Sequence, residues 1–75
     1  MSRRVRVKAA GDNPRSILWK GRWHPVVDIM ELWRDTGEWW QGETEKLFYR
    51  LRLSDGSLLE IYRAGEEWFL YKVYD

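Results

Sequence analysis

The segment from residue 46 to residue 74 carries an alternation that leaves few folds open to this chain. Every second residue of its first eight is apolar: Leu47, Tyr49, Leu51 and Leu53. A period of two is typical of a β-strand with one buried face. A three-residue loop, Ser54-Asp55-Gly56, with Gly56 in the left-handed conformation, would place Leu51 opposite Leu59 and Tyr49 opposite Ile61. A two-residue loop would set Leu51 against Glu60 and lose the apolar face, so we expect the longer loop.

A third strand follows a turn near Gly65 and extends the same face. Pairing Ile61 with Tyr71 and Leu59 with Val73 keeps one side apolar. The opposite side then carries a row of alternating charges, formed by Arg50, Glu60 and Lys72. Three strands that agree on one register predict an antiparallel meander.

The N-terminal part also shows strand signals. Residues 4 to 8 alternate basic and apolar side chains, a turn follows at residues 11 to 14, and residues 16 to 20 form a second short strand. Between Trp23 and Trp33 the apolar residues fit either a strand or a helical stripe. Pro25 and the neighbouring β-formers favour a long, bent strand. A short helical turn over residues 28 to 35 is the alternative.

These patterns predict an all-β fold in a single domain over residues 1–75. We expect an antiparallel meander of five to six strands, curled into a small barrel or an SH3-like roll so that both sheet edges are covered. The chain has no cysteine, so six Trp, four Tyr and two Phe must supply the core by packing alone.

Composition excludes several kinds of chemistry. Without cysteine there is no disulfide, thiolate nucleophile or cysteine metal site, and His24 is the single histidine. The six glycines stand singly, so no glycine-rich phosphate loop is formed. We therefore expect no enzyme activity, no cofactor, no metal and no small-molecule substrate. No apolar run approaches the roughly 20 residues of a membrane span, which predicts a cytoplasmic protein that does not use a membrane. We expect a monomer or a weak dimer.

Charge is distributed unevenly along the chain. The formal net charge is +1, yet residues 1 to 22 hold seven basic and one acidic side chain, which gives +6, and the remainder carries −5. Such a division predicts an anionic partner for the N-terminal part. The alternative is that the two parts neutralise each other across the folded surface.

A candidate nucleic-acid interface lies in this basic part. Its cations are interleaved with two tryptophans: Arg4, Arg6, Lys8, Trp19, Lys20, Arg22 and Trp23. Cations neutralise phosphates, and aromatic faces stack unpaired bases at about 1–3 kcal/mol each. The partner would be single-stranded DNA, unless both tryptophans belong to the core.

A second candidate site is the pair Trp39 and Trp40. Neighbouring residues of an extended segment point to opposite sides, so one of the two rings is expected at the surface. An exposed tryptophan is a frequent anchor of protein interfaces, which predicts an adaptor that uses Trp39, Trp40 and a sheet edge. Alternatively, the two rings cap the open ends of a small barrel.

Several aromatic segments together resemble a known family. They lie at residues 18–23, 27–33, 39–40, 48–51, 59–63, 68–70 and 73–75. Over about residues 3 to 75 the chain is similar to a small bacterial domain of unknown function. Members of that family occur alone or at the C-terminal end of ImuB-like proteins, non-catalytic homologues of Y-family DNA polymerases of the mutasome. The resemblance implies an accessory role in DNA repair or damage tolerance, in contact with DNA or with a repair protein.

Overall fold

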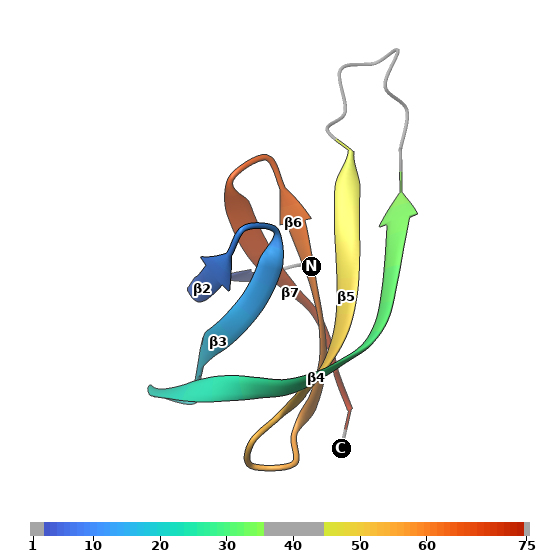
Figure 1. Cartoon of the computed structure of the whole chain (residues 1–75). Coiled ribbons are helices and arrows are strands. Elements are labelled where there is room, and N and C mark those ends of the chain that lie inside the picture. The colour runs from blue at the N-terminus through green and yellow to red at the C-terminus, as the bar shows by residue number, and fades with distance from the viewer. Residues whose placement is uncertain (1–2, 36–44, 75) are drawn as a thin grey trace.

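Seven antiparallel strands make up the computed structural model, which describes residues 3–35 and 45–74. The strands are β1 (Arg3–Val5), β2 (Val7–Ala10), β3 (Asn13–Trp19), β4 (Arg22–Asp35), β5 (Lys46–Leu53), β6 (Leu58–Ala64) and β7 (Glu67–Tyr74). Their order in the sheet is β1-β7-β6-β5-β4-β3-β2 (Figure 1). The described residues contain no helix, and hence none long and apolar enough to cross a membrane. The predicted all-β class is confirmed.

The N-terminal segment brings the two ends of this strand order together. β1 pairs with β7 and β2 pairs with β3, although only Arg6 separates β1 from β2. The backbone amide of Leu18 donates to the carbonyl of Arg6 at 2.9 Å and ties the junction to β3. The alternating segment expected as one strand is therefore divided into two. This division raises the count from the expected five to six strands to seven and curls the sheet into a half-barrel (Figure 1).

The hairpin between β5 and β6 has the predicted register. Leu51 lies opposite Leu59, Tyr49 opposite Ile61, and Arg50 opposite Glu60. The amide of Leu53 donates to the carbonyl of Ser57 at 2.9 Å, which closes a loop of three residues. Gly56 adopts a φ of 90° in this loop, a conformation that other residues rarely take.

The predicted pairing of β6 with β7 is right at one end and wrong at the other. Leu59 lies opposite Val73 and Glu60 opposite Lys72, as expected, but Ile61 pairs with Leu70 instead of Tyr71. A β-bulge at Tyr71 causes this shift. Leu70 and Val73 are three residues apart, so an unbroken strand would send them to opposite faces. The extra residue lets both pair with core residues of β6, Leu70 with Ile61 and Val73 with Leu59, although Val73 stays 44% exposed.

The segment from residue 22 to residue 35 is one long strand, β4. The helical turn considered for residues 28 to 35 is therefore wrong, and the long, bent strand is confirmed. Residues 22 to 25 pair with β3 and residues 26 to 35 pair with β5. Register shifts leave Val27 and Met30 as extra residues, and such bulges bend a strand. Val26, Ile29 and Leu32 pair with the core residues of β5, and the bulges space them three residues apart, which explains why the sequence also suited a helix.

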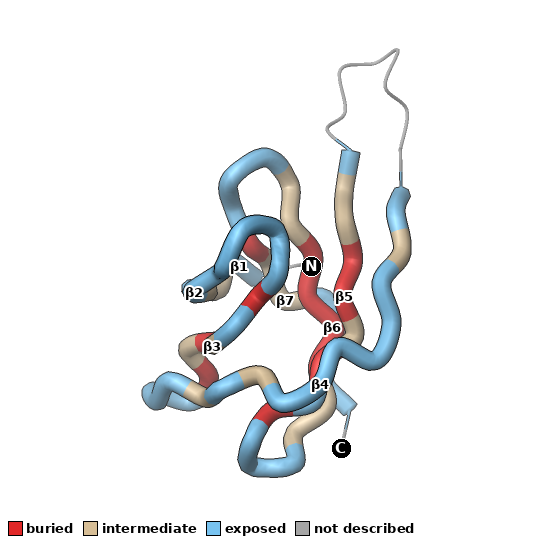
Figure 2. Tube along the Cα trace, in the orientation of Figure 1, coloured by how far each residue is buried: buried red, intermediate tan, exposed pale blue. Residues whose placement is uncertain are grey.

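The core lies between the two halves of the curled sheet (Figure 2). Its buried members are contributed mainly by β3, β5 and β6: Ile17, Trp19, Tyr49, Leu51, Leu53, Leu59, Ile61 and Trp68. The hydroxyl of Tyr49 donates to the carbonyl of Asp12 at 2.5 Å and so anchors the β2–β3 turn. Burial raises the pKa of Tyr49, and the nearby carboxylate of Asp12 adds to the effect.

The opposite side of β4–β7, which we call the outer face, carries two rows across the strands. One row is aromatic: Trp33, Phe48, Tyr62 and Phe69 are paired in turn. The other row is charged and confirms the predicted series of Arg50, Glu60 and Lys72, with Glu31 added on β4. Glu60 is only 2% exposed, and it accepts hydrogen bonds from Arg50 Nε at 3.0 Å and from the hydroxyl of Tyr74.

Candidate nucleic-acid interface

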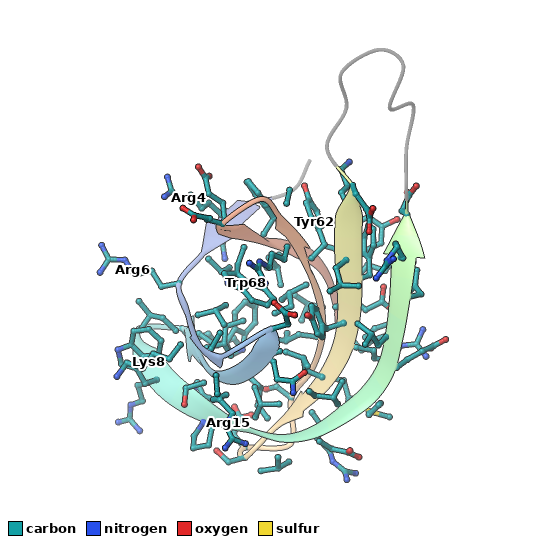
Figure 3. The ribbon with its side chains drawn as sticks, turned by 45° about the horizontal axis from the view of Figure 1, so that its top comes forward. Arg4, Arg6, Lys8, Arg15, Tyr62 and Trp68 are labelled. Carbon is teal, nitrogen blue, oxygen red and sulfur yellow. The ribbon has the colours of Figure 1, made fainter. Side chains whose placement is uncertain are left out.

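The N-terminal strands direct their cations to solvent. Val5 and Val7 pack against the core, and because successive residues of a strand alternate, Arg4, Arg6 and Lys8 project outward. All three are exposed, and Figure 3 shows them along one side of the molecule. The alternation in the sequence therefore serves two purposes: the valines close the core and the cations line the surface.

A tight hairpin between β3 and β4 presents two further cations, Lys20 and Arg22. Trp19 pairs with Arg22, which leaves a loop of two residues. Both loop residues have positive φ, 51° at Lys20 and 78° at Gly21, as a type I′ turn requires. Lysine rarely adopts this conformation, so the turn holds an exposed cation at some cost in backbone strain.

The two predicted tryptophans lie on opposite sides of the sheet. Trp19 is 7% exposed and belongs to the core, so it is not available for stacking and does not belong to the interface. Trp23 pairs with Leu18, and both lie on the side of the sheet that faces away from the core. The Trp23 side chain is 42% exposed. The ammonium of Lys8 lies 4.6 Å from the centre of its ring. We call these exposed residues, Arg4, Arg6, Lys8, Lys20, Arg22 and Trp23, the basic face. Arg22 pairs with Trp19 and so lies on the other side of the sheet from Trp23.

Most cations of the basic face have no carboxylate partner. Among the described residues, Arg6, Lys8, Lys20 and Arg22 form no ion pair within 4.0 Å. Arg4 contacts Glu67 at 3.5 Å. The single acidic residue of the N-terminal part, Asp12, is paired with Arg63 of β6 at 2.7 Å. In the described parts of the chain, neutralisation between the two halves is thus limited to these two ion pairs.

A groove of about 630 Å³ borders the basic face. It is lined by Arg4, Val5, Arg6, Val7, Trp23, Glu66, Glu67 and Trp68. The predicted residues Arg4, Arg6 and Trp23 are thus brought together, whereas Lys20 and Arg22 lie outside this groove. The sequence did not indicate Glu66, Glu67 or Trp68 as site residues, because they reach the groove through the pairing of β1 with β7. The expectation that both sheet edges are covered was the one signal in the sequence that could have pointed to this pairing.

The remaining predicted site residues lie elsewhere. Trp39 and Trp40, expected at a protein interface, fall outside the described residues. His24 is half-buried, and its ring lies 3.1 Å from the carbonyl of Trp19 and 3.9 Å from Asp55. Hydrogen bonds from Ser57 lower the pKa of Asp55. Within the described residues, no group of three or more histidine, aspartate or glutamate side chains could hold a metal ion.

Comparison with known families identifies the domain. The profile of a family described as a domain of unknown function, DUF6504, matches residues 2–75. The chain belongs to this family. The match spans nearly the whole sequence, which supports the resemblance to a small domain of unknown function. No curated protein matches the chain, and no solved structure does.

Proposed function

We propose that this DUF6504 domain is a non-enzymatic module that binds single-stranded nucleic acid through its basic face. The observation that carries the proposal is the pair of exposed cations Arg6 and Lys8, which have no carboxylate partner among the described residues and lie close to the exposed ring of Trp23. Lys20 and Arg22 add two exposed cations in the neighbouring β3–β4 hairpin. Unpaired surface cations contribute little to folding, whereas they gain free energy by releasing counterions from a phosphate backbone. An exposed indole adds a stacking surface for an unpaired base.

The proposed setting is DNA repair or damage tolerance. It rests on the resemblance to domains that accompany ImuB-like polymerase homologues, and single-stranded DNA is the substrate that such machinery exposes.

Salt-dependent binding tests the proposal. The anisotropy of a labelled oligothymidylate should show binding that weakens about 20- to 100-fold between about 50 and 200 mM salt, the range for three to five phosphate contacts. The double variant Arg6→Glu/Lys8→Glu should abolish it. The matched control Arg52→Glu/Lys72→Glu changes the net charge equally on the outer face and should retain much tighter binding than the first variant. Equal affinities of the two variants, with both folded by amide NMR, would refute the proposal.

A second candidate, a protein–protein adaptor, is favoured by the edge of β4. Residues 26 to 35 of this strand pair with β5 alone among the described strands, and Val27, Ile29, Met30 and Leu32 are exposed. The bulges at Val27 and Met30 interrupt the regular backbone of this edge, so a partner would dock on the side chains instead of adding a strand.

Photo-crosslinking in cells distinguishes this candidate. A benzophenone side chain in place of Leu32 should capture one discrete protein at both low and high salt, whereas the same group in place of Arg52 should capture none. The absence of a discrete product at position 32 would count against the adaptor.

A further inference from the structure

The groove beside the basic face contains acidic groups that phosphate binding does not explain. Glu66 lies in the β6–β7 turn and Glu67 is the first residue of β7, and both line the groove together with Arg6 and Trp23. A carboxylate repels a phosphate, so a nucleic-acid strand that contacts Arg6 must place something other than phosphate against these side chains.

The two glutamates differ in what they contact. Glu67 lies 3.5 Å from Arg4 and is engaged by that guanidinium. Glu66 is exposed and has no ion pair or hydrogen bond to any other described residue. The groove therefore offers a cation, an aromatic ring and one uncommitted carboxylate within a single hollow of about 630 Å³. A volume of this size falls in the range of small-molecule sites and is ample for one nucleobase.

A carboxylate selects among bases by the donors they present. An ionised glutamate only accepts hydrogen bonds, and its two oxygens can take two parallel donors. Guanine carries such a pair on its Watson–Crick edge, the ring N1–H and the exocyclic N2 amino group. Adenine and cytosine place one amino group beside an acceptor nitrogen, and thymine places one N–H between two carbonyls, so each would set an acceptor against the carboxylate.

We propose that the groove binds an unpaired guanine, with its ring against Trp23, its Watson–Crick edge on the Glu66 carboxylate and its phosphate near Arg6. This inference rests on the proposed function and specifies the base that the same surface prefers. Unpaired bases are commonly recognised by this combination of stacking and hydrogen bonding on the Watson–Crick edge. Since bidentate pairs discriminate bases by about tenfold or more, the preference should be readily measured.

Competition between oligonucleotides tests the inference. Binding of an oligothymidylate is compared with that of the same oligomer carrying one central deoxyguanosine, deoxyinosine, deoxyadenosine or deoxycytidine. A single guanosine cannot form a quadruplex, so any gain reflects the site. We expect about tenfold tighter binding with guanosine and a loss of most of this gain with inosine, which lacks the N2 amino group.

Variants then assign the preference to Glu66. Glu66→Gln keeps the size of the side chain but places an amide donor where a second acceptor is needed, so the guanosine preference should fall to about one while the oligothymidylate still binds. Glu31→Gln removes an exposed carboxylate of the outer face and should leave the preference intact. Equal binding of all oligomers, or a preference that persists in Glu66→Gln, would overturn this inference and leave the proposed function standing. No binding of any oligomer would overturn both.

Discussion

The basic face and the outer face both combine cations with aromatic rings, but their cations have different surroundings. On the outer face, Arg50 contacts Glu31 at 2.8 Å and Glu60 at 2.9 Å, and it lies over the rings of Trp33 and Tyr74. On the basic face, Lys8 has an aromatic neighbour, Trp23, and no carboxylate among the described residues. Arg50 of the outer face is neutralised by neighbouring carboxylates, whereas most cations of the basic face have no carboxylate partner among the described residues. Similar residue types therefore stabilise the fold on one surface and, on the function proposed above, bind a partner on the other.

The largest expected effect concerns the aromatic residues of the two faces. Phe48 is 7% exposed and stacks on Trp33 with ring centres 5.3 Å apart. Phe48→Ala should lower the free energy of unfolding by about 3–5 kcal/mol, because a buried ring is lost and a cavity remains. Trp23→Ala removes an exposed ring and should lower it by about 1 kcal/mol or less. Urea denaturation of both variants measures the difference, and equal losses would show that the two faces are not distinct.

Removal of the paired arginine should have the next largest effect. Arg50→Leu leaves the buried carboxylate of Glu60 with Tyr74 but without its cation, and buried charges without partners are strongly destabilising. Arg6→Leu removes a cation that has no carboxylate partner and should leave the thermal midpoint unchanged. Thermal unfolding followed by circular dichroism compares the two variants. A larger fall of the thermal midpoint in Arg6→Leu than in Arg50→Leu would show that Arg6, and not Arg50, is the arginine that stabilises the fold.

Acid should destabilise the domain through the outer face. Burial by itself would raise the pKa of Glu60, but hydrogen bonds from Tyr74 and Arg50 outweigh it and leave the pKa below the usual value of 4.5. Because the folded state holds this pKa down, the stabilisation is present above about pH 4.5 and is lost as the pH falls through the folded-state value. Urea denaturation between pH 7 and pH 3 should show this loss. The slope should be shallower in Glu60→Gln, and an unchanged slope would exclude Glu60 as its source.

The smallest effect concerns the strained turn of the basic face. Lys20 has a φ of 51°, where asparagine is better tolerated than lysine. Lys20→Asn should raise the free energy of unfolding by up to about 1 kcal/mol and weaken oligonucleotide binding through the lost charge. Denaturation and anisotropy of the same variant measure both quantities. Unchanged binding with higher stability would place Lys20 outside the interface.

Local signals predicted the β5–β6 hairpin correctly because its information lies within a few residues. Gly56 permits the left-handed turn, and a slip of one residue would expose the apolar side of both strands. The bulge at Tyr71 could not be predicted in the same way. It depends on which residues of β7 face the core, and that is decided by the packing of Trp68 and Leu70 against distant strands.

The candidate site was predicted in part for the same reason. The alternation of residues 4 to 8 was sufficient to place three cations on one side. The exposure of Trp23 and the burial of Trp19 follow from the two-residue loop at Lys20 and Gly21, which pairs Trp23 with Leu18. The sequence indicated a turn at Lys20 and Gly21, but it did not establish that the loop has two residues, and this length decides which tryptophan is buried. The groove required the pairing of β1 with β7, across more than sixty residues of chain, which short-range patterns do not encode.

The split N-terminal strand has a consequence for how the domain folds. Arg4 lies opposite Phe69, so β1 finds its partner only after β7 has been made. The local hairpins of β3 to β7 can form as they emerge, whereas the join at β1 must close a long loop and should come late. Until then Trp68 and the valines of the first strands lack their cover. The pairing of β1 with β7, expected late in folding, is also the step that brings the groove residues together.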